Sequence, residues 1–338
     1  MSSNSASPIP LAGSLPVELA RHAGFAQVFQ PDRLTFGLIM PLEGYPDSPF
    51  PTLENHVELA VKADQAGFAT LWMRDVPFYD PTFGDTGQML DPMVYLGFLA
   101  AYTRRIALGT TGIVLPLRDP LIVAKQATSV DQLTNGRFIL GLSSGDRAVE
   151  YPAFGVNHDN RGERYREAFS IIRTVSEEHF PTFKSEHYGE MRGSLELIPR
   201  PVASRVPTIV VGRARQDIAW IAKNSDGWIW HISDFARLPE IIRSWREAGD
   251  GKTFKPYGYA TFFDLDENPN LPLQRGSNGV RIGRNALIDL WKQQEALGIS
   301  HVALNLKPLR RPAAEAMEEL AEYVLPHFPA GKVARPEV

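Results

Sequence analysis

The chain has no cysteine among its 338 residues, which excludes disulfides, thiolate nucleophiles and cysteine metal sites. Its eight histidines form no HxH or HExxH pair, so the sequence predicts no metal site. A surplus of positive charge is also missing, because 35 basic residues stand against 39 acidic ones and the net charge is −4. A nucleic-acid backbone is therefore not an expected partner.

Long hydrophobic runs are absent, and nothing in the sequence approaches the length of a membrane span. Residues 1–14 lack the basic and apolar regions of a secretory signal. The sequence therefore predicts a cytoplasmic protein with no membrane partner. Hydrophobic residues make up 43% of the chain and charged ones 22%, so a large core can be buried.

The chain does contain a clear strand, helix, strand unit at residues 105–146. Two short apolar runs, residues 106–110 and 137–142, flank a helix-length segment, and each run ends in small residues. Runs that are apolar on both faces and joined by a helix are typical of parallel sheets. Small residues at the carboxyl ends of such strands let a flat ligand approach the backbone.

The same alternation continues along the chain. Asp91-Pro92 and Asp119-Pro120 each predict a helix start, with Asp as the N-cap and Pro in the first turn. The whole pattern predicts about eight strands alternating with about eight helices. No GxGxxG follows the first strand, so we expect an α/β protein with a (β/α)₈ TIM barrel rather than an open doubly wound sheet.

Several segments around this barrel carry expectations of their own. Residues 1–33 are predicted to be an extension packed on the barrel, with a short helix over 15–25, and residues 34–338 to form one barrel domain. A helix is expected to begin at Thr52. Insertions are expected after strands four and seven, the second as a polar loop over residues 266–283.

A barrel builds its active site from the loops that follow its strands, so small and polar residues at strand ends are candidates for chemistry. In strand order they are Glu43, Tyr45, Arg74, Asp75, Thr110, Thr111, Gly112, Ser143, Ser144, Gly145, Asp146, Arg147, Gly212, Arg213, Ala214, Arg215, Gln216, Trp230, His231, Asn305 and Lys307. Aromatic residues that could line a dry pocket are Tyr45, Phe78, Phe83 and Trp230.

Several of these candidates have two interpretations. Arg213 and Arg215 precede a predicted helix, where they could bind a phosphate together with helix amides or simply solvate a loop. His231 could transfer a proton or merely fill the rim of the barrel. Asp75 could orient a substrate, or it could anchor a neighbouring loop through Arg74. The residues alone leave these alternatives open.

The serines after strand four also have two interpretations. Ser143 and Ser144 could donate hydrogen bonds to a planar heterocycle, although small polar residues at a strand end are also common in turns. Gly141, Ser143 and Gly145 have the spacing of a nucleophile elbow. That motif belongs to a hydrolase fold, so we interpret the match in a barrel as accidental.

The chain from residue 34 to 328 resembles the bacterial luciferase-like monooxygenases, a family of flavin- or deazaflavin-dependent (β/α)₈ proteins. The resemblance lies in residues 66–75, 91–146, 153–169, 206–212, 225–230 and 296–305. Family members hold the flavin ring over the end of strand three, often beside a non-proline cis peptide. Thr111-Gly112 has that place here, and Thr110 precedes it.

The resemblance implies further roles, residue by residue. Ser143, Ser144 and Gly145 fall where relatives contact the flavin, and residues 212–216 fall where relatives bind the cofactor phosphate. From their places at strand ends, Asp75, His231 and Arg147 are our candidates for catalytic residues. Many relatives have a histidine directly after the acidic residue that ends strand two, whereas Val76 and Pro77 follow Asp75 here. The luciferase reaction itself is therefore not expected.

The resemblance implies a flavin-dependent oxidoreductase, most simply a two-component monooxygenase that acts on a small organic substrate with O₂. Its cofactor would be reduced FMN supplied by a separate flavin reductase. Two alternatives stay open: hydride transfer with the deazaflavin coenzyme F420 on the same barrel, and a non-catalytic flavin-binding barrel. A homodimer or higher homo-oligomer is expected from the family.

Overall fold

The predicted (β/α)₈ barrel is confirmed by a computed structural model that describes residues 13–276 and 279–329. The barrel strands are β1 (Thr35–Ile39), β2 (Thr70–Met73), β3 (Ala107–Thr110), β5 (Phe138–Ser143), β8 (Thr208–Val211), β9 (Gly227–His231), β10 (Tyr257–Leu265) and β13 (His301–Asn305). Each strand pairs in parallel with its neighbours, and β13 pairs with both β10 and β1. That last pairing closes the sheet.

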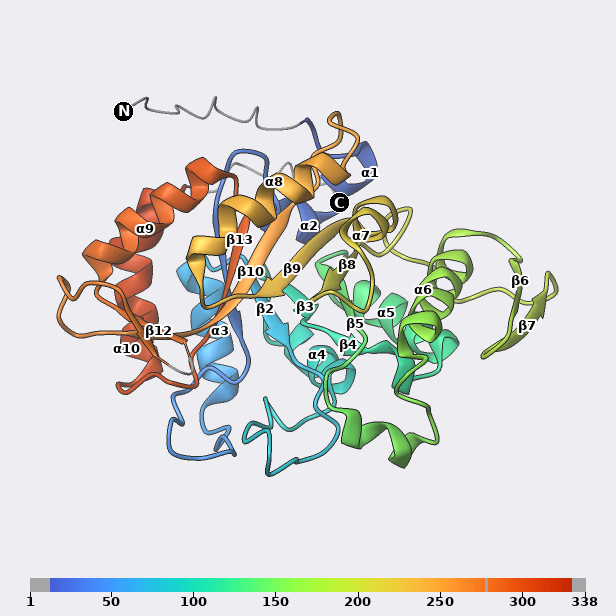
Figure 1. Ribbon diagram of the computed structural model, residues 1–338, viewed down its shortest axis with the longest axis horizontal. Helices are drawn as coiled ribbons and strands as arrows, with labels where there is room; N and C mark the ends of the chain where they lie inside the picture. Colours follow the sequence, from blue (N-terminus) through green and yellow to red (C-terminus); the bar gives the residue numbers. More distant parts are fainter. Residues whose placement is uncertain (1–12, 277–278, 330–338) are drawn as a thin grey trace.

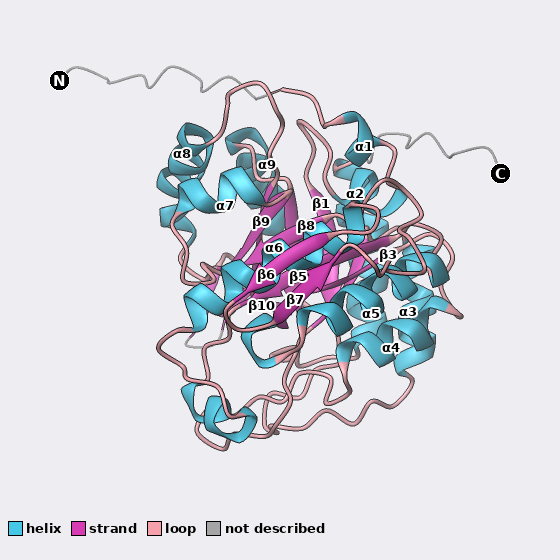
Figure 2. Cartoon of the chain, turned by 90° about the vertical axis from the view of Figure 1, so that its right-hand side faces the viewer, coloured by secondary structure: helices cyan, strands magenta, loops and turns pink. Residues whose placement is uncertain are grey.

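Helices surround this sheet (Figures 1 and 2). They are α3 (His56–Ala66), α4 (Pro92–Ala100), α5 (Pro120–Leu133), α6 (Arg161–Glu177), α7 (Ile218–Asn224), α8 (Leu238–Ala248), α9 (Arg284–Leu297) and α10 (Ala313–Glu319). The Asp91 and Asp119 side chains each accept hydrogen bonds from two backbone amides at the start of α4 and α5. Both predicted N-caps are therefore confirmed.

Two insertions interrupt the alternation where the sequence predicted them. After the fourth barrel strand come a 3₁₀ segment (Ala148–Phe154), α6 and the hairpin of β6 (Thr182–Ser185) and β7 (Gly189–Arg192). After the seventh come β11 (Gln274–Gly276) and β12 (Gly279–Ile282). The expectation of a loop throughout 266–283 was wrong, because β10 continues past the barrel and offers β12 an edge to pair with.

The helix expected from Thr52 begins later, at His56. Leu53 and Asn55 both have positive φ, 58° and 56°, which a right-handed helix does not allow. Thr52 instead closes a turn. Its hydroxyl donates to the Glu43 carboxylate at 2.6 Å and accepts a hydrogen bond from the Glu54 amide at 3.1 Å.

Two short helices, α1 (Val17–Ala20) and α2 (Ala23–Val28), replace the single helix expected over 15–25. His22 separates the two helices and caps α2. Its ring accepts a hydrogen bond from the Phe25 amide and lies 3.3 Å from the Asp131 carboxylate of α5. Phe25, Val28 and Phe29 are fully buried against the amino ends of the strands. These helices close that end of the barrel, while the domain boundary at residue 33 stays a prediction.

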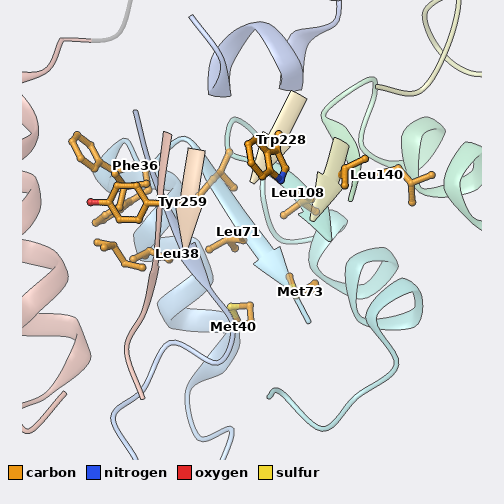
Figure 3. Packing of buried hydrophobic residues seen from close by; sticks show 14 of the residues in the cluster. Phe36, Leu38, Met40, Leu71, Met73, Leu108, Leu140, Trp228 and Tyr259 are labelled. Atoms are coloured by element: carbon orange, nitrogen blue, oxygen red, sulfur yellow. The ribbon is translucent and has the colours of Figure 1, made fainter. Parts of the chain in front are cut away.

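Side chains along each strand alternate between two cores, one between the sheet and the helices and one inside the barrel. Phe36 and Leu38 of β1 point outward, where Phe36 packs 4.2 Å from Trp291 of α9, and Figure 3 shows this outer core. Ile39 points inward with Trp72 of β2. At the amino end of the barrel the inner layer holds a buried histidine, His301, the first residue of β13. Among the described residues, no helix is long and apolar enough to cross a membrane.

Candidate active site

A cavity of about 940 Å³ opens at the carboxyl ends of the barrel strands. The long loops that follow β1, β2 and β5 gather at this end, opposite α1 and α2 (Figure 1). Of the residues predicted to form the site, those that line it are Arg74, Asp75, Thr111, Gly112, Ser143, Ser144, Gly145, Asp146, Arg147, Gly212, Arg213, Ala214, Trp230, His231, Asn305 and Lys307. Its volume suits a cofactor together with a small substrate.

The floor of the cavity is backbone from the ends of β3 and β5. The Thr111-Gly112 peptide is cis, as the resemblance led us to expect. Ser143 donates its hydroxyl to the carbonyl of Gly112 at 3.2 Å, which ties the two loops together. Thr110 does not reach the cavity: it is fully buried and bridges to both backbone groups of Gly141.

One polar atom of this floor lacks a partner. The Thr111 hydroxyl is buried and forms no hydrogen bond with any described residue. Buried polar groups in proteins are nearly always paired. The floor thus offers a hydrogen-bonding group that the described protein residues leave unused.

The end of β8 contributes a glycine and an arginine to the cavity. A Cβ added at Gly212, which has φ of 67°, would meet no other atom within 4 Å, so the backbone there is open to a ligand. The Arg213 guanidinium lies about 6 Å from the rings of Trp228 and Trp230. Within the described chain its one hydrogen bond is long, 3.4 Å to the carbonyl of Gln216. Arg213 is therefore available to an anion.

Ala214 also lines the cavity, whereas Arg215 and Gln216, the last two residues of the predicted phosphate run, do not. Gln216 donates to the carbonyls of Gly162 and Ala214, and Arg215 packs against Gly162 of α6. The expectation that the arginines sit at a helix start was wrong. Ala214 and Arg215 take positive φ, which makes a turn, and α7 begins only at Ile218 with its amide end capped by an aspartate.

Asp75 is held by contacts that differ from those expected. Its carboxylate accepts from Arg118 at 2.7 and 3.0 Å and from the Val114 amide at 2.9 Å, and its side chain is 2% exposed. The anchoring interpretation is the one these contacts support, with Arg118 rather than Arg74 as the partner. The carboxylate fixes the segment that follows the cavity floor, and a catalytic role for Asp75 stays a prediction.

Arg147 holds the loop between β2 and α4. Its guanidinium donates to the carbonyls of Asp85 at 2.8 Å and Phe78 at 3.3 Å, and it lies 4.2 Å from the centre of the Phe83 ring. Phe83 lines the cavity, whereas Phe78 is 52% exposed and packs on Phe154 outside it. Arg147 thereby fastens this loop over the cavity.

Asp85 is a buried hub that the sequence did not reveal. Its carboxylate accepts from Arg74, from the Tyr45 hydroxyl at 3.2 Å and from the Gly87 amide at 3.1 Å, and Lys307 lies 3.8 Å away. Burial would raise the pKa of Asp85, but the adjacent Arg74 lowers it overall. Tyr45 lies behind this carboxylate rather than on the cavity wall, and burial raises the pKa of its hydroxyl.

His231 ends β9 and faces the cavity. Its ring packs edge-on against Phe262 at 5.5 Å and forms no hydrogen bond to a described residue. Desolvation within the cavity and the nearby Arg74 lower the pKa of His231 below its ordinary value, although its side chain is exposed to the cavity, and this favours the neutral ring. A neutral imidazole at this position can donate or accept a hydrogen bond.

A second wall, formed beyond β10, was also missed by sequence reasoning. Asp264 of β10 stands opposite Arg281 of β12 at 3.5 Å, and both line the cavity. Burial raises the pKa of Asp264 despite the arginines beside it. The alternation of β10 carried a signal, since Asp264 shares a face with Phe262, but the pairing with β12 could not be read from the loop-like sequence.

Within residues 13–276 and 279–329, one group could hold a metal ion, Glu167 of α6 with Glu186 and His187 of the β6–β7 turn. It lies outside the cavity. The prediction that the protein has no metal site therefore stays a prediction.

Comparisons with known proteins fit this geometry. The family model of luciferase-like monooxygenases matches residues 34–263. A 4-hydroxyprotoasukamycin monooxygenase from Streptomyces nodosus subsp. asukaensis is 30% identical over 53% of this chain and 47% of its own length. A putative coenzyme F420-dependent oxidoreductase from Mycobacterium tuberculosis is 30% identical over 58% of this chain and 56% of its own. The chain thus spans about half the length of these curated relatives.

Solved structures show the same fold at lower sequence identity. A monooxygenase from Streptomyces bottropensis superposes with a TM-score of 0.73 at 19% identity, covering 87% of this chain and 99% of that one. An F420-dependent secondary alcohol dehydrogenase gives 0.71 at 18% identity with the same coverage. These likenesses support the barrel and leave the reaction open.

Proposed function

Because the chain belongs to the luciferase-like monooxygenase family, we propose that it is a flavin-dependent oxidoreductase, a monooxygenase that uses reduced FMN and O₂ on a small organic substrate. The observation that carries the proposal is the backbone floor of the cavity between Thr111 and Gly145, with Arg213 at one end. That floor offers an unpartnered hydroxyl and open backbone to a planar ring, and Arg213, whose one side-chain hydrogen bond within the described chain is long, offers its guanidinium to a phosphate.

The described residues fit such a cofactor. Thr111, Gly112 and Ser144 would face the ring, and Arg213 beside Gly212 would hold the phosphate. When bound, reduced FMN would supply the electrons for O₂. The protein would position the substrate, exclude water with the loop that Arg147 fastens, and offer the neutral His231 as a hydrogen-bonding group.

A second candidate, hydride transfer with coenzyme F420, is favoured by the 30% identical mycobacterial relative, whose name gives it that coenzyme. The same floor would hold either ring. Anaerobic titration with reduced FMN and with reduced F420 separates the two, since the proposal predicts saturable binding of FMN. Absence of FMN binding at micromolar concentrations, with F420 bound, would establish the second candidate instead.

Turnover is tested by adding a flavin reductase, which we propose as the source of reduced FMN. Oxygen consumption that depends on an added organic substrate supports a monooxygenase. Consumption that yields only hydrogen peroxide across a broad substrate panel would favour a barrel that binds flavin without catalysis.

We also propose a homodimer, and an exposed apolar face on α4 and α5 supports it. Val94 is 72% exposed and Phe98 43%, one turn apart on α4, and Leu133 at the end of α5 is 64% exposed beside them. Light scattering after size-exclusion chromatography should give a dimer mass for the native chain. The paired change Val94→Lys and Phe98→Lys should give a monomer, and a native monomer would contradict the proposal.

A further inference from the structure

Positive charge exceeds negative charge on the cavity wall formed near the ends of β13, β1 and β2. Arg74, Arg147 and Lys307 line the cavity there, with side chains 18%, 5% and 14% exposed. Asp85 is the carboxylate in contact with Arg74 and the nearest to Lys307. Arg147 is paired with Glu150 at 3.8 Å, so the surplus lies with Arg74 and Lys307, which share the one carboxylate of Asp85.

The remaining carboxylates on this side do not balance the surplus. Asp75 also lines the cavity, but it is committed to Arg118. Asp47 and Asp146 are exposed and form no ion pair with the three cations among the described residues. Solvent screens exposed carboxylates of this kind.

The hydrogen bonds of Lys307 and Arg147 go to backbone carbonyls, which satisfy N–H groups without cancelling charge. Lys307 donates to the carbonyls of Ser48 at 2.9 Å and Gly84 at 3.2 Å, and Arg147 donates to two further carbonyls. Arg74 uses only Nη1, for Asp85, so the edge formed by its Nε and Nη2 has no partner in the described chain. Such an edge matches a carboxylate in a bidentate pair.

Two partly buried cations that share one carboxylate leave a positive charge without a counter-ion, and a bound anion would neutralise it. The positive charge of Arg74 acts on neighbouring side chains. The pKa values of Lys307 and His231 are lowered mainly by desolvation and further by Arg74. An anion on this wall would be favoured by the same field.

This wall is separate from the place proposed for the cofactor phosphate. Strands β13, β1 and β2 are consecutive in the barrel, and β8, which precedes Arg213, lies across it, beyond β3 and β5 in one direction and beyond β9 and β10 in the other. One phosphate at Arg213 would not neutralise Arg74 and Lys307 on the opposite side.

We propose that the substrate is an organic carboxylate whose head group lies between Arg74 and Lys307, with its apolar part on Ile39, Phe83 and Phe262. The last three residues line the cavity beside this wall. The role as substrate rests on the proposed function, whereas the preference for a carboxylate is a property of the wall itself.

The test uses hexanoate and its neutral counterpart hexanamide, titrated into the full chain and followed by calorimetry. The wild type is expected to bind hexanoate at least about tenfold more tightly than hexanamide, with affinity that falls as salt is added. Arg74→Gln should reduce that preference about tenfold or more. Arg243→Gln, an exposed arginine of α8, should leave it unchanged. Equal binding of the two probes by the wild type, or no binding of either at millimolar concentration, would overturn the proposal.

A second variant keeps the test valid if Arg74→Gln does not fold. Lys307→Met removes the other charge and should lower hexanoate affinity in the same direction, with hexanamide affinity retained. Binding of reduced FMN by the wild type and variants is measured in parallel, and it should be nearly unchanged by both substitutions. Loss of FMN affinity with hexanoate affinity intact would assign the wall to the cofactor and overturn the inference, whereas failure of FMN to bind the wild type would refute the proposed function alone.

Discussion

The two ends of the barrel are built from the same strands and differ in how their polar groups are satisfied. At the amino end, Trp72 donates to His301 at 3.0 Å and the other ring nitrogen of His301 lies 2.7 Å from the Thr35 hydroxyl, all three fully or almost fully buried under α2. At the carboxyl end, Thr111, Arg74 and Arg213 keep polar groups without partners among the described residues. One end is completed by the chain and the other is left for a ligand.

Because of this difference, residues at the amino end stabilise the barrel and residues at the carboxyl end are available for binding. Glycines at 37 and 109 make room for the closed network, because a Cβ at Gly109 would lie 2.3 Å from the Trp72 ring. At the open end, Gly212 has empty space above it. Substitutions at the closed end should therefore change stability, and those at the open end should change binding.

The largest effect is expected from Phe25→Ala at the closed end. Phe25 is fully buried and packs 4.9 Å from Phe29, so its truncation should lower the free energy of unfolding by about 3–5 kcal/mol. Urea denaturation measures this change. Val17→Ala, at a position 63% exposed on α1, is the control and should cost under about 0.5 kcal/mol. The comparison fails if Phe25→Ala weakens ligand binding in the folded protein without lowering stability.

Asp75→Asn removes a structural contact at the open end, the ion pair of Asp75 with Arg118. Removing this carboxylate leaves Arg118, 22% exposed, with Asp91 as its remaining counter-ion, and should lower the free energy of unfolding by about 1–3 kcal/mol. Asp146→Asn, an exposed carboxylate in the same cavity, should be neutral in the same thermal melts. If Asp75→Asn melts like the wild type and abolishes turnover, Asp75 is a catalytic residue and not an anchor.

Arg213→Gln should affect binding and leave stability unchanged. Loss of a charge-assisted contact to the phosphate is worth about 1.5–3 kcal/mol, which corresponds to about 10–100-fold weaker binding of reduced FMN. Arg215→Gln is the matched control, because Arg215 lies beyond the cavity lining. If the two substitutions weaken FMN binding equally, the phosphate is bound by the whole 213–216 segment and not by Arg213 alone.

The smallest effect is a pH dependence at the closed end. Burial lowers the pKa of His301 to about 3, from 6.5 in the unfolded chain. Between those values the unfolded state binds the extra proton, so the unfolding free energy should fall with decreasing pH below 6.5, by up to about 1.4 kcal/mol per pH unit. Urea midpoints from pH 7.5 to 5.5 measure it. His301→Gln should flatten the curve and His327→Gln, an exposed histidine, should not.

Much of the fold could be predicted because its signals are local. The Asp-Pro pairs mark helix starts, and the apolar runs mark buried parallel strands, so the barrel and the place of the cavity floor followed from short segments. The late start of α3 after Asn55 and the pairing of β12 with β10 had no such local signal. They depend on a left-handed residue and on an edge offered by a distant strand.

The site was predictable where one residue decides it and not where several loops meet. Thr111, Ser143 and Arg213 stand at strand ends and line the cavity as expected. Asp85 lies in the middle of a loop and accepts a hydrogen bond from Tyr45, 40 residues away in the sequence. No sequence motif links the two residues, so this contact could not be predicted. Likewise, the partner of Asp75 is 43 residues away in the chain, so the local choice of its neighbour Arg74 was wrong.

The decisive measurement is a crystal structure of the protein with bound FMN. We expect the ring over Thr111 and Gly112 beside Ser143, with the phosphate on Arg213 and the Arg74 wall left open. A phosphate bound to Arg74 and Lys307, or a ring bound outside the cavity, would contradict it.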